Sequence, residues 1–155
     1  MALRFDQLFD PKQIALDLRA TNQNDAIIEV VKLLRGNGRV DDSYAFADAV
    51  MQREGRSSTN TGEGVAFPHA RTDLVPELVL GIGRSKAGVQ FGESQAPVQL
   101  VFLLGVPQRL VSDYLICVGT IARIVKPQER RDALLSAETP AAFADILRTG
   151  ALLLE

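Results

Sequence analysis

The run Val98-Gln99-Leu100-Val101-Phe102-Leu103-Leu104 is apolar at every position except the second. A strand reads in this way when helices cover both faces of its sheet, because neither set of side chains then meets water. A strand with one wet face would alternate apolar and polar residues. We therefore expect residues 98–104 to be a central strand that is buried on both sides.

Shorter apolar runs, bounded by turn residues, predict the remaining strands. They lie at residues 13–18, 64–67 and 78–82, with a weaker candidate at 88–91. Residues 55–64 lack large apolar side chains and are predicted to be a loop. Helical segments alternate with the strands, so the chain is predicted to be a single mixed α/β (α+β) domain over residues 1–155, layered around a mixed sheet.

Helices are predicted where apolar residues recur every three or four positions. The ranges are 24–35, 42–54, 110–124, 127–135 and 140–149. Asn24 is a candidate N-cap of the first helix, and Pro127 is expected to be the first residue of the fourth. Thr139 before Pro140 is a strong start signal for the last helix, which Gly150 is expected to end.

The composition excludes several classes of function. The formal net charge is −2, so the chain lacks the basic field that binding to nucleic acid or to an anionic membrane surface would require. No apolar run approaches the roughly 20 residues of a membrane span, and the first residues do not resemble a signal peptide. The protein is therefore expected in the cytoplasm. Its one cysteine, Cys117, is expected to be a buried core thiol.

The one histidine, His69, lies in an unusual setting. The loop before it, Ser58-Thr59-Asn60-Thr61-Gly62-Glu63-Gly64, is rich in hydroxyls and glycines, and a short apolar segment then ends in Pro68. Glycines let main-chain N–H groups approach an anion closely, and Pro68 restricts the direction in which the chain leaves the strand. Arg53 and Arg71 are near enough in sequence to reach an anion held there.

This arrangement brings an imidazole and an anion site together. Neutral imidazole is a good nucleophile near pH 7, and guanidinium groups offset the charge of a phosphoryl group. A lone histidine is more often a surface or core residue, and on composition alone that interpretation stays open. Zinc is excluded because one histidine and one distant cysteine are too few ligands. The glycines match neither a G-x-S-x-G elbow nor a Walker loop.

Residues 53–71 read RE-x-x-x-STNTGEGVAFPHAR, which closely resembles the active-site signature of phosphotransferase-system enzyme IIA domains of the fructose/mannitol/nitrogen type. That signature joins an Arg-Glu pair, a Ser-Thr pair, a glycine-punctuated loop and a Pro-His ending. The order of elements before it matches the same family. So do the segments GVQF (88–91), APVQLVF (96–102) and Val106-Pro107 after it. The resemblance covers nearly the whole chain.

The resemblance implies a three-layer α/β/α sandwich with a central mixed β-sheet. It implies that His69 accepts a phosphoryl group from a histidine-containing carrier protein (HPr or its nitrogen-branch relative), with no metal or cofactor. Arg53 would bind the phosphoryl oxygens. The phosphate pocket would further include Ser58, Thr59, Thr61, Gly62, Glu63 and Gly64, with Arg71 close by. Sugar-transporting members pass the group on to a cysteine of an enzyme IIB.

One position departs from the family. Many members carry a second histidine close to the first, and the alignment through PVQLVFLLGVP places Tyr114 there. A tyrosine can donate a hydrogen bond but adds no positive charge near pH 7. A plain packing role for Tyr114 in its helix stays open. Ala70, where glycine is common, is a small change.

Three functions remain open. The first is a nitrogen-regulatory phosphocarrier that binds regulatory partner proteins according to its phosphorylation state, because no IIB, IIC or carrier segment is fused to it. The second is a sugar-specific IIA domain that passes the group to an enzyme IIB. The third is a non-catalytic binding or sensor domain, supported by the missing second histidine. A weak homodimer would require Val106-Pro107 and the loops to present apolar surface.

Overall fold

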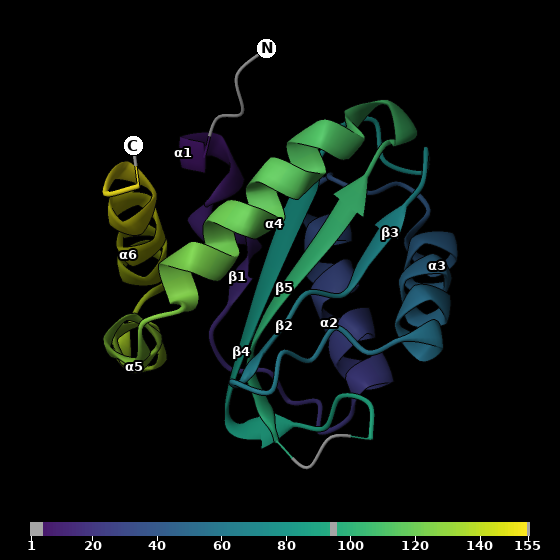
Figure 1. Ribbon diagram of the computed structural model, residues 1–155. Helices are drawn as coiled ribbons and strands as arrows, with labels where there is room; N and C mark the ends of the chain where they lie inside the picture. The colour runs from purple at the N-terminus through teal and green to yellow at the C-terminus, as the bar shows by residue number, and fades with distance from the viewer. Residues whose placement is uncertain (1–4, 94–95, 155) are drawn as a thin grey trace.

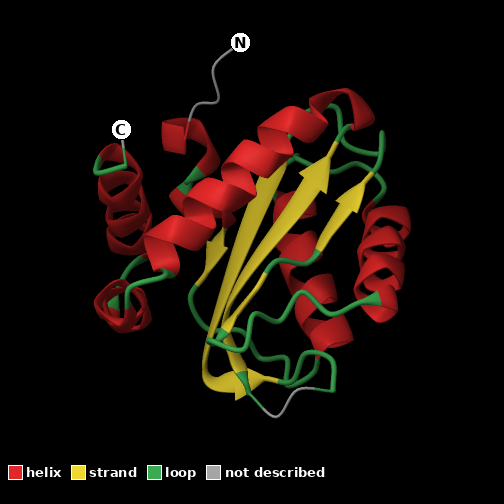
Figure 2. Cartoon of the chain, in the orientation of Figure 1, coloured by secondary structure: helices red, strands yellow, loops and turns green. Residues whose placement is uncertain are grey.

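The computed structural model describes residues 5–93 and 96–154 as a mixed sheet between two layers of helices (Figure 1). The strands are β1 (Ile14–Ala15), β2 (Val65–Ala66), β3 (His69–Arg71), β4 (Val79–Val89) and β5 (Val98–Val106). The helices are α1 (Phe5–Leu8), α2 (Gln23–Gly36), α3 (Ser43–Arg56), α4 (Val111–Val125), α5 (Gln128–Ser136) and α6 (Pro140–Leu152), with the 3-10 turns η1 (Pro11–Gln13) and η2 (Gln108–Leu110). Figure 2 shows the helices lying on both sides of the sheet, which confirms the three-layer mixed α/β fold.

β5 is the centre of the sheet, as the apolar run at 98–104 predicts. It pairs antiparallel with β4 on one side and parallel with β2 and β3 on the other, and β1 lies beyond β4. All of its residues are buried except the partly exposed Gln99. The strand continues past its predicted end to Val106 and leads through η2 into α4.

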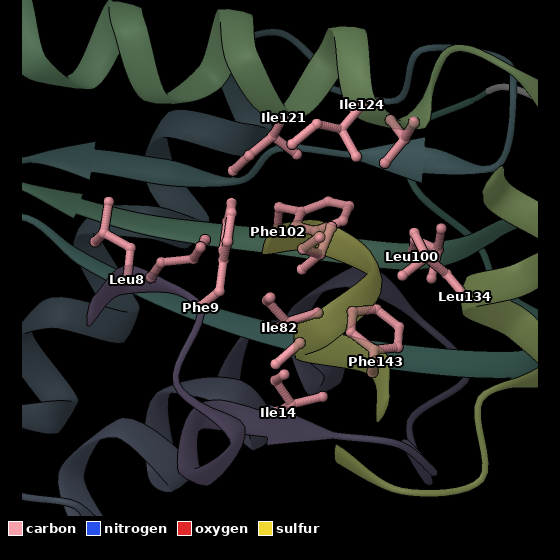
Figure 3. Packing of buried hydrophobic residues seen from close by; sticks show 14 of the residues in the cluster. Leu8, Phe9, Ile14, Ile82, Leu100, Phe102, Ile121, Ile124, Leu134 and Phe143 are labelled. Carbon is pink, nitrogen blue, oxygen red and sulfur yellow. The ribbon is translucent and has the colours of Figure 1, made fainter. Parts of the chain in front are cut away.

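One face of the sheet is covered by α4, α5 and α6. Figure 3 shows Phe102 of β5 in this layer with Ile121 of α4, Leu134 of α5 and Phe143 of α6, and all four are fully buried. Such side chains are each worth about 1.5–3 kcal/mol of transfer free energy when removed from water. This layer therefore fixes the position of α4 over the sheet.

The other face is covered by α2 and α3, which approach the strands closely. Val30 of α2 and Phe46 of α3 are both fully buried there. A Cβ on Gly81 would lie 2.7 Å from Val30 Cγ1, and one on Gly105 would lie 2.8 Å from Phe46 Cζ. These two strand positions are glycine because a side chain would push the helices away from the sheet.

The predicted helix starts are partly right. Thr139 caps α6 by accepting a hydrogen bond from the Ala142 N–H at 3.0 Å. The prediction of Asn24 as the first N-cap was wrong: the cap is Asn22, whose side-chain oxygen accepts from the Asp25 N–H at 2.9 Å. Two asparagines two positions apart suit the cap equally by type, so packing selects between them. Pro127 lies just before α5 and not inside it.

The predicted helix ends were too early. α3 continues to Arg56, two residues past the predicted end at 54. α6 continues past Gly150, which does not have the positive φ of a helix-terminating glycine. A Cβ on Gly150 would instead lie 2.9 Å from Ile124 Cγ2, so this glycine permits close packing of α6 on α4.

The sheet also differs from the prediction at its strand boundaries. The expected strand at 13–18 is reduced to the two residues of β1. Gln13 belongs to η1, and the strand ends at Ala15. The expected strands at 78–82 and 88–91 merge into β4, in which Arg84 is buried. Its guanidinium donates to three carbonyl oxygens, those of Leu16, Leu134 and Ala137. A charged residue can therefore continue the strand without facing water.

Apolar residues of α4 and of the end of β5 are used for packing. Cys117 is fully buried, and burial raises the pKa of its thiol to about 12, so the predicted core role is confirmed.

Val106 and Pro107 are buried too, so they do not supply the apolar surface that a weak homodimer would need. Within residues 5–93 and 96–154, no helix has the length and apolar character of a membrane span.

Candidate functional site

His69 lies where an edge strand of the sheet is interrupted. β2 and β3 keep the same register with β5, so they are two halves of one strand that is broken at Phe67-Pro68. Pro68 has no N–H to contribute to the ladder, although its carbonyl accepts from the Leu104 N–H at 3.0 Å. The predicted strand at 64–67 is thus shorter than expected. His69 is the first residue of the next strand, and its side chain is half-buried.

Both ring nitrogens of His69 have partners. Nδ1 lies 2.9 Å from the carbonyl oxygen of Phe67, and Nε2 lies 3.2 Å from the hydroxyl of Tyr114. A carbonyl oxygen can only accept, so a neutral ring must carry its hydrogen on Nδ1. Nε2 then has a free electron pair, to which the Tyr114 hydroxyl donates. The two rings lie with centroids 5.0 Å apart.

The surroundings of His69 favour the neutral ring. Burial lowers the pKa of His69 below 6.5, and the positive charge of Arg53 lowers it further. The Phe67 carbonyl and the negative charge of Glu54 act in the opposite direction without reversing the shift. Burial also raises the pKa of Tyr114, so its hydroxyl keeps its proton. The site thus holds a neutral nucleophile beside a hydrogen-bond donor.

A cavity of about 520 Å³ opens beside these two rings, between α3, β3 and the start of α4. It is lined by His69 and Tyr114 together with Arg53, Arg56 and Arg71. Within the described part of the chain, none of the three arginines pairs with a carboxylate, and the Arg53 side chain donates only to the Ser57 carbonyl at 3.0 Å. Unpaired guanidinium groups around a small polar cavity suit an anion with several oxygens, such as a phosphoryl group.

The structure therefore brings together four of the residues that the sequence singled out. His69, Arg53, Arg71 and Tyr114 come from α3, β3 and α4 and share one cavity. Arg56 is an addition that the sequence analysis missed, because the second helix was predicted to end before it. Its spacing of three from Arg53 would have been the signal, since such positions share a helix face.

The loop residues of the predicted pocket lie elsewhere. Ser58 Oγ accepts from the Asn60 N–H, and the Thr61 hydroxyl donates to the Val65 carbonyl. Gly62 and Gly64 both adopt the positive φ of 84° that glycine permits. Residues 62–64 line a separate cavity with Arg131, whose guanidinium lies 3.4 Å from the Glu63 carboxylate.

Thr59 and Glu54 form a pair behind this loop. Glu54 is only 2% exposed, and Thr59 donates to it from both its N–H and its hydroxyl. In the sequence, Glu54 stands out only as the second residue of the Arg-Glu signature. No group of three or more His, Cys, Asp or Glu side chains in the described residues is placed to hold a metal ion.

The comparisons identify the class of protein. The family model for "Phosphoenolpyruvate-dependent sugar phosphotransferase system, EIIA 2" matches residues 7–150, and the chain belongs to this family. Domains of this family are phosphotransfer components of that system, which is consistent with a histidine beside a cavity lined by arginines.

Individual relatives come from both branches of the family. The chain is 33% identical to the fructose-specific EIIA component of Haloferax volcanii, over 86% of this chain and 88% of that protein. It is 31% identical to the fructose-specific EIIABC component of Bacillus subtilis, over 94% of this chain but only 23% of that longer protein. It is 25% identical to the nitrogen regulatory protein of Pseudomonas aeruginosa, over 94% of this chain and 95% of that one.

Solved structures agree on the fold. The nitrogen regulatory protein IIA-Ntr from Neisseria meningitidis superposes with a TM-score of 0.83 at 24% identity, over 92% of this chain and 97% of that one. Mannitol enzyme IIA in its complex with phosphorylated enzyme IIB, from Escherichia coli, superposes with a TM-score of 0.78 at 19% identity, over 89% of this chain and 95% of that one.

Proposed function

We propose that the chain, as a single domain over residues 1–155, is a cytoplasmic phosphocarrier that accepts a phosphoryl group on His69. The donor is a phosphorylated carrier protein of the HPr type. The observation that carries this proposal is the state of the ring: Nδ1 is tied to the Phe67 carbonyl, and Nε2 keeps its electron pair. The same ring lines a cavity with three arginines that have no carboxylate partner among the described residues.

Nε2 of His69 is the nitrogen that attacks the phosphoryl group. Its electron pair forms a new bond to phosphorus while the bond from phosphorus to the donor's histidine breaks, and that electron pair returns to the donor ring. The hydrogen on Nδ1 of His69 stays on that nitrogen and is donated to the Phe67 carbonyl, which stabilises the positive charge that develops on the ring. Arg53, with Arg56 and Arg71, offsets the charge on the phosphoryl oxygens.

Tyr114 contributes a neutral hydrogen-bond donor to the transfer, at the position where many family members have a second histidine. Its hydroxyl, 3.2 Å from Nε2, must leave the electron pair before transfer. It then donates to a phosphoryl oxygen, because its raised pKa keeps the proton in place. One neutral donor replaces the charge that a histidinium would add.

Two acceptors are candidates for the next step. A nitrogen-regulatory role, in which partner proteins bind one phosphorylation state, is supported by the similarity to the nitrogen regulatory protein of Pseudomonas aeruginosa over nearly the full length of both chains. A sugar-specific role, in which an enzyme IIB cysteine takes the group, is supported by the higher identity to the fructose-specific relatives. Ser58, Thr59, Thr61, Gly62, Glu63 and Gly64 are not among the residues that line the His69 cavity, so the proposal gives them no contact with the phosphoryl group in either role.

The test combines phosphoenolpyruvate, enzyme I and HPr with the purified chain and then measures its intact mass. We expect a gain of one phosphoryl group in the wild type and no gain in His69→Ala. No gain in the wild type, or a gain that persists in His69→Ala, would contradict the proposal. Adding a purified fructose-type enzyme IIB then shows whether its cysteine takes the group. Binding to a partner without any phosphorylation would point to the non-catalytic alternative.

A further inference from the structure

A short polar network connects α3 to the residue that contacts the His69 ring. The Glu54 carboxylate accepts the Thr59 N–H on Oε2 at 2.6 Å and the Thr59 hydroxyl on Oε1 at 2.8 Å. A carboxylate that is 2% exposed is costly unless such donors satisfy it. Glu54 and Thr59 therefore hold each other in place.

The Thr59 hydroxyl also reaches the broken strand. Its oxygen lies 3.0 Å from the backbone nitrogen of Phe67, whose N–H can only donate. The single hydroxyl hydrogen is thus given to Glu54, and an electron pair of the same oxygen faces Phe67. Phe67 follows β2 at the edge of the sheet, where Thr59 supplies the partner that a further strand would otherwise provide.

Phe67 is consequently held on both sides. Its N–H is bound by Thr59, and the next residue, Pro68, has a fixed φ. The carbonyl between them is the group that lies 2.9 Å from His69 Nδ1. The direction of this carbonyl determines which ring nitrogen carries the hydrogen, since no other group is bonded to Nδ1 among the described residues.

We propose that Glu54 and Thr59 are positioning residues: they aim the Phe67 carbonyl at Nδ1–H and so keep Nε2 of His69 as the nitrogen with the free electron pair. The consequence for transfer rests on the proposed function, whereas the position of the ring hydrogen does not. Thr59 thereby acts on the ring and not on the phosphate, because its hydroxyl hydrogen is already donated to Glu54.

The experiment uses the fact that the chain has one histidine. In tag-free, ¹⁵N-labelled protein, long-range NMR correlations of the imidazole report directly which nitrogen is protonated in the neutral ring. The variants are Thr59→Val, which removes the hydroxyl; Thr59→Ser, which restores it; and Glu54→Gln, whose amide group replaces one acceptor by a donor. Thr139→Val is the matched control, because it removes a threonine hydroxyl bond of similar length at the start of α6.

We expect the hydrogen on Nδ1 in the wild type, in Thr59→Ser and in Thr139→Val. Thr59→Val and Glu54→Gln should populate the form with the hydrogen on Nε2. Phosphorylation of Thr59→Val from phosphorylated HPr should be about tenfold slower or more, because the nucleophile is misplaced or protonated. If Thr59→Val acted only by lowering stability, Thr139→Val should be slowed to a similar degree, and the ring hydrogen should stay on Nδ1 in both variants.

Two results would overturn the inference. One is a Thr59→Val ring that keeps its hydrogen on Nδ1 as in the wild type, whatever happens to the rate. The other is a shift of the hydrogen in Thr139→Val as large as that in Thr59→Val. If instead the hydrogen moves in Thr59→Val while the wild type never accepts a phosphoryl group, the positioning role stands and the proposed function fails.

Discussion

Two groups of arginines in this molecule differ in what their guanidinium groups contact. Arg84 lies inside β4, is 3% exposed and donates to three backbone carbonyl oxygens. Arg53, Arg56 and Arg71 line the cavity beside His69 and have no carboxylate partner within the described residues. A guanidinium with satisfied donors holds strands and helices together, whereas a cluster with free donors is available to an anion.

The comparison explains why charge alone does not mark a functional site. Arg84 is the more deeply buried residue, yet its guanidinium is engaged by carbonyls from two segments, the residues after β1 and the end of α5. The cavity arginines are near a neutral imidazole, and in the described part of the chain the Ser57 carbonyl is the one acceptor that they contact. Their charge is therefore useful only when an anion enters.

The largest expected effect is on the rate of phosphoryl transfer in Arg53→Met. Removing one donor to the charge that develops in the transition state typically costs about 100-fold or more in rate. The thermal midpoint should change little, because Arg53 makes one backbone hydrogen bond. Single-turnover transfer from phosphorylated HPr measures this, with Arg35→Met in the last turn of α2 as the control. An unchanged rate in Arg53→Met would place the phosphoryl group elsewhere.

The second effect is on stability and is expected from Arg84→Met. The free energy of unfolding should fall by about 3 kcal/mol, because two buried carbonyls and one partly buried carbonyl lose a charged donor at once. Urea denaturation measures the loss, and transfer by the folded fraction should stay at the wild-type rate. Arg109→Met is the matched control, since that exposed guanidinium donates to the Pro76 carbonyl at the surface. Equal losses in both variants would show that the three hydrogen bonds of Arg84 add no more stability than one hydrogen bond at the surface.

A smaller change is expected for Tyr114→Phe. The variant keeps the ring in place but loses the hydroxyl that contacts Nε2, so transfer should be about tenfold slower, the cost of one hydrogen bond to a charged group. Tyr44→Phe is the control, because Tyr44 is 88% exposed. If Tyr114→Phe transfers at the wild-type rate, the hydroxyl has no part in the transfer, and Tyr114 has only a packing role in its helix.

The smallest expected effect is on the pH dependence of stability. The pKa of His69 is lowered in the folded state, so as the pH falls below about 6.5 the unfolded chain binds a proton before the folded chain does. Stability that is present above pH 6.5 is thus lost progressively until the pH passes the lower, folded-state pKa. The difference in unfolding free energy between wild type and His69→Ala, followed from pH 8 to pH 5, isolates this contribution. A wild type that gains stability relative to the variant on acidification would show the opposite shift.

Much of the fold followed from patterns that are local in the chain. The apolar run at 98–104 identified the central strand, and Thr139 and Asp42 marked helix starts, since both side chains cap the helices that follow them. Asn22 was missed because Asn24 suits a cap equally by residue type, and Gly150 was wrongly predicted to end the last helix because a glycine that ends a helix and one that permits close packing look alike in sequence.

Part of the site was equally accessible. Pro68-His69, Arg53 and the position of Tyr114 were recognised from their spacing and from the family signature. Arg56 was missed because it lies beyond the predicted end of its helix, and Glu54 because a carboxylate gives no sign in sequence of being buried. The loop glycines were expected beside the phosphate, but they line a second cavity with Arg131.

The sequence by itself determined the layers, the central strand and the single imidazole with arginines near it, because periodicity and spacing act over a few residues. Tertiary structure alone decided that Nδ1 of His69 faces a carbonyl while Nε2 faces Tyr114, since these partners approach from different segments. It also decided which arginines are saturated and which are free. Hydrogen-bond satisfaction depends on atoms that are distant in the chain, so no local pattern specifies it.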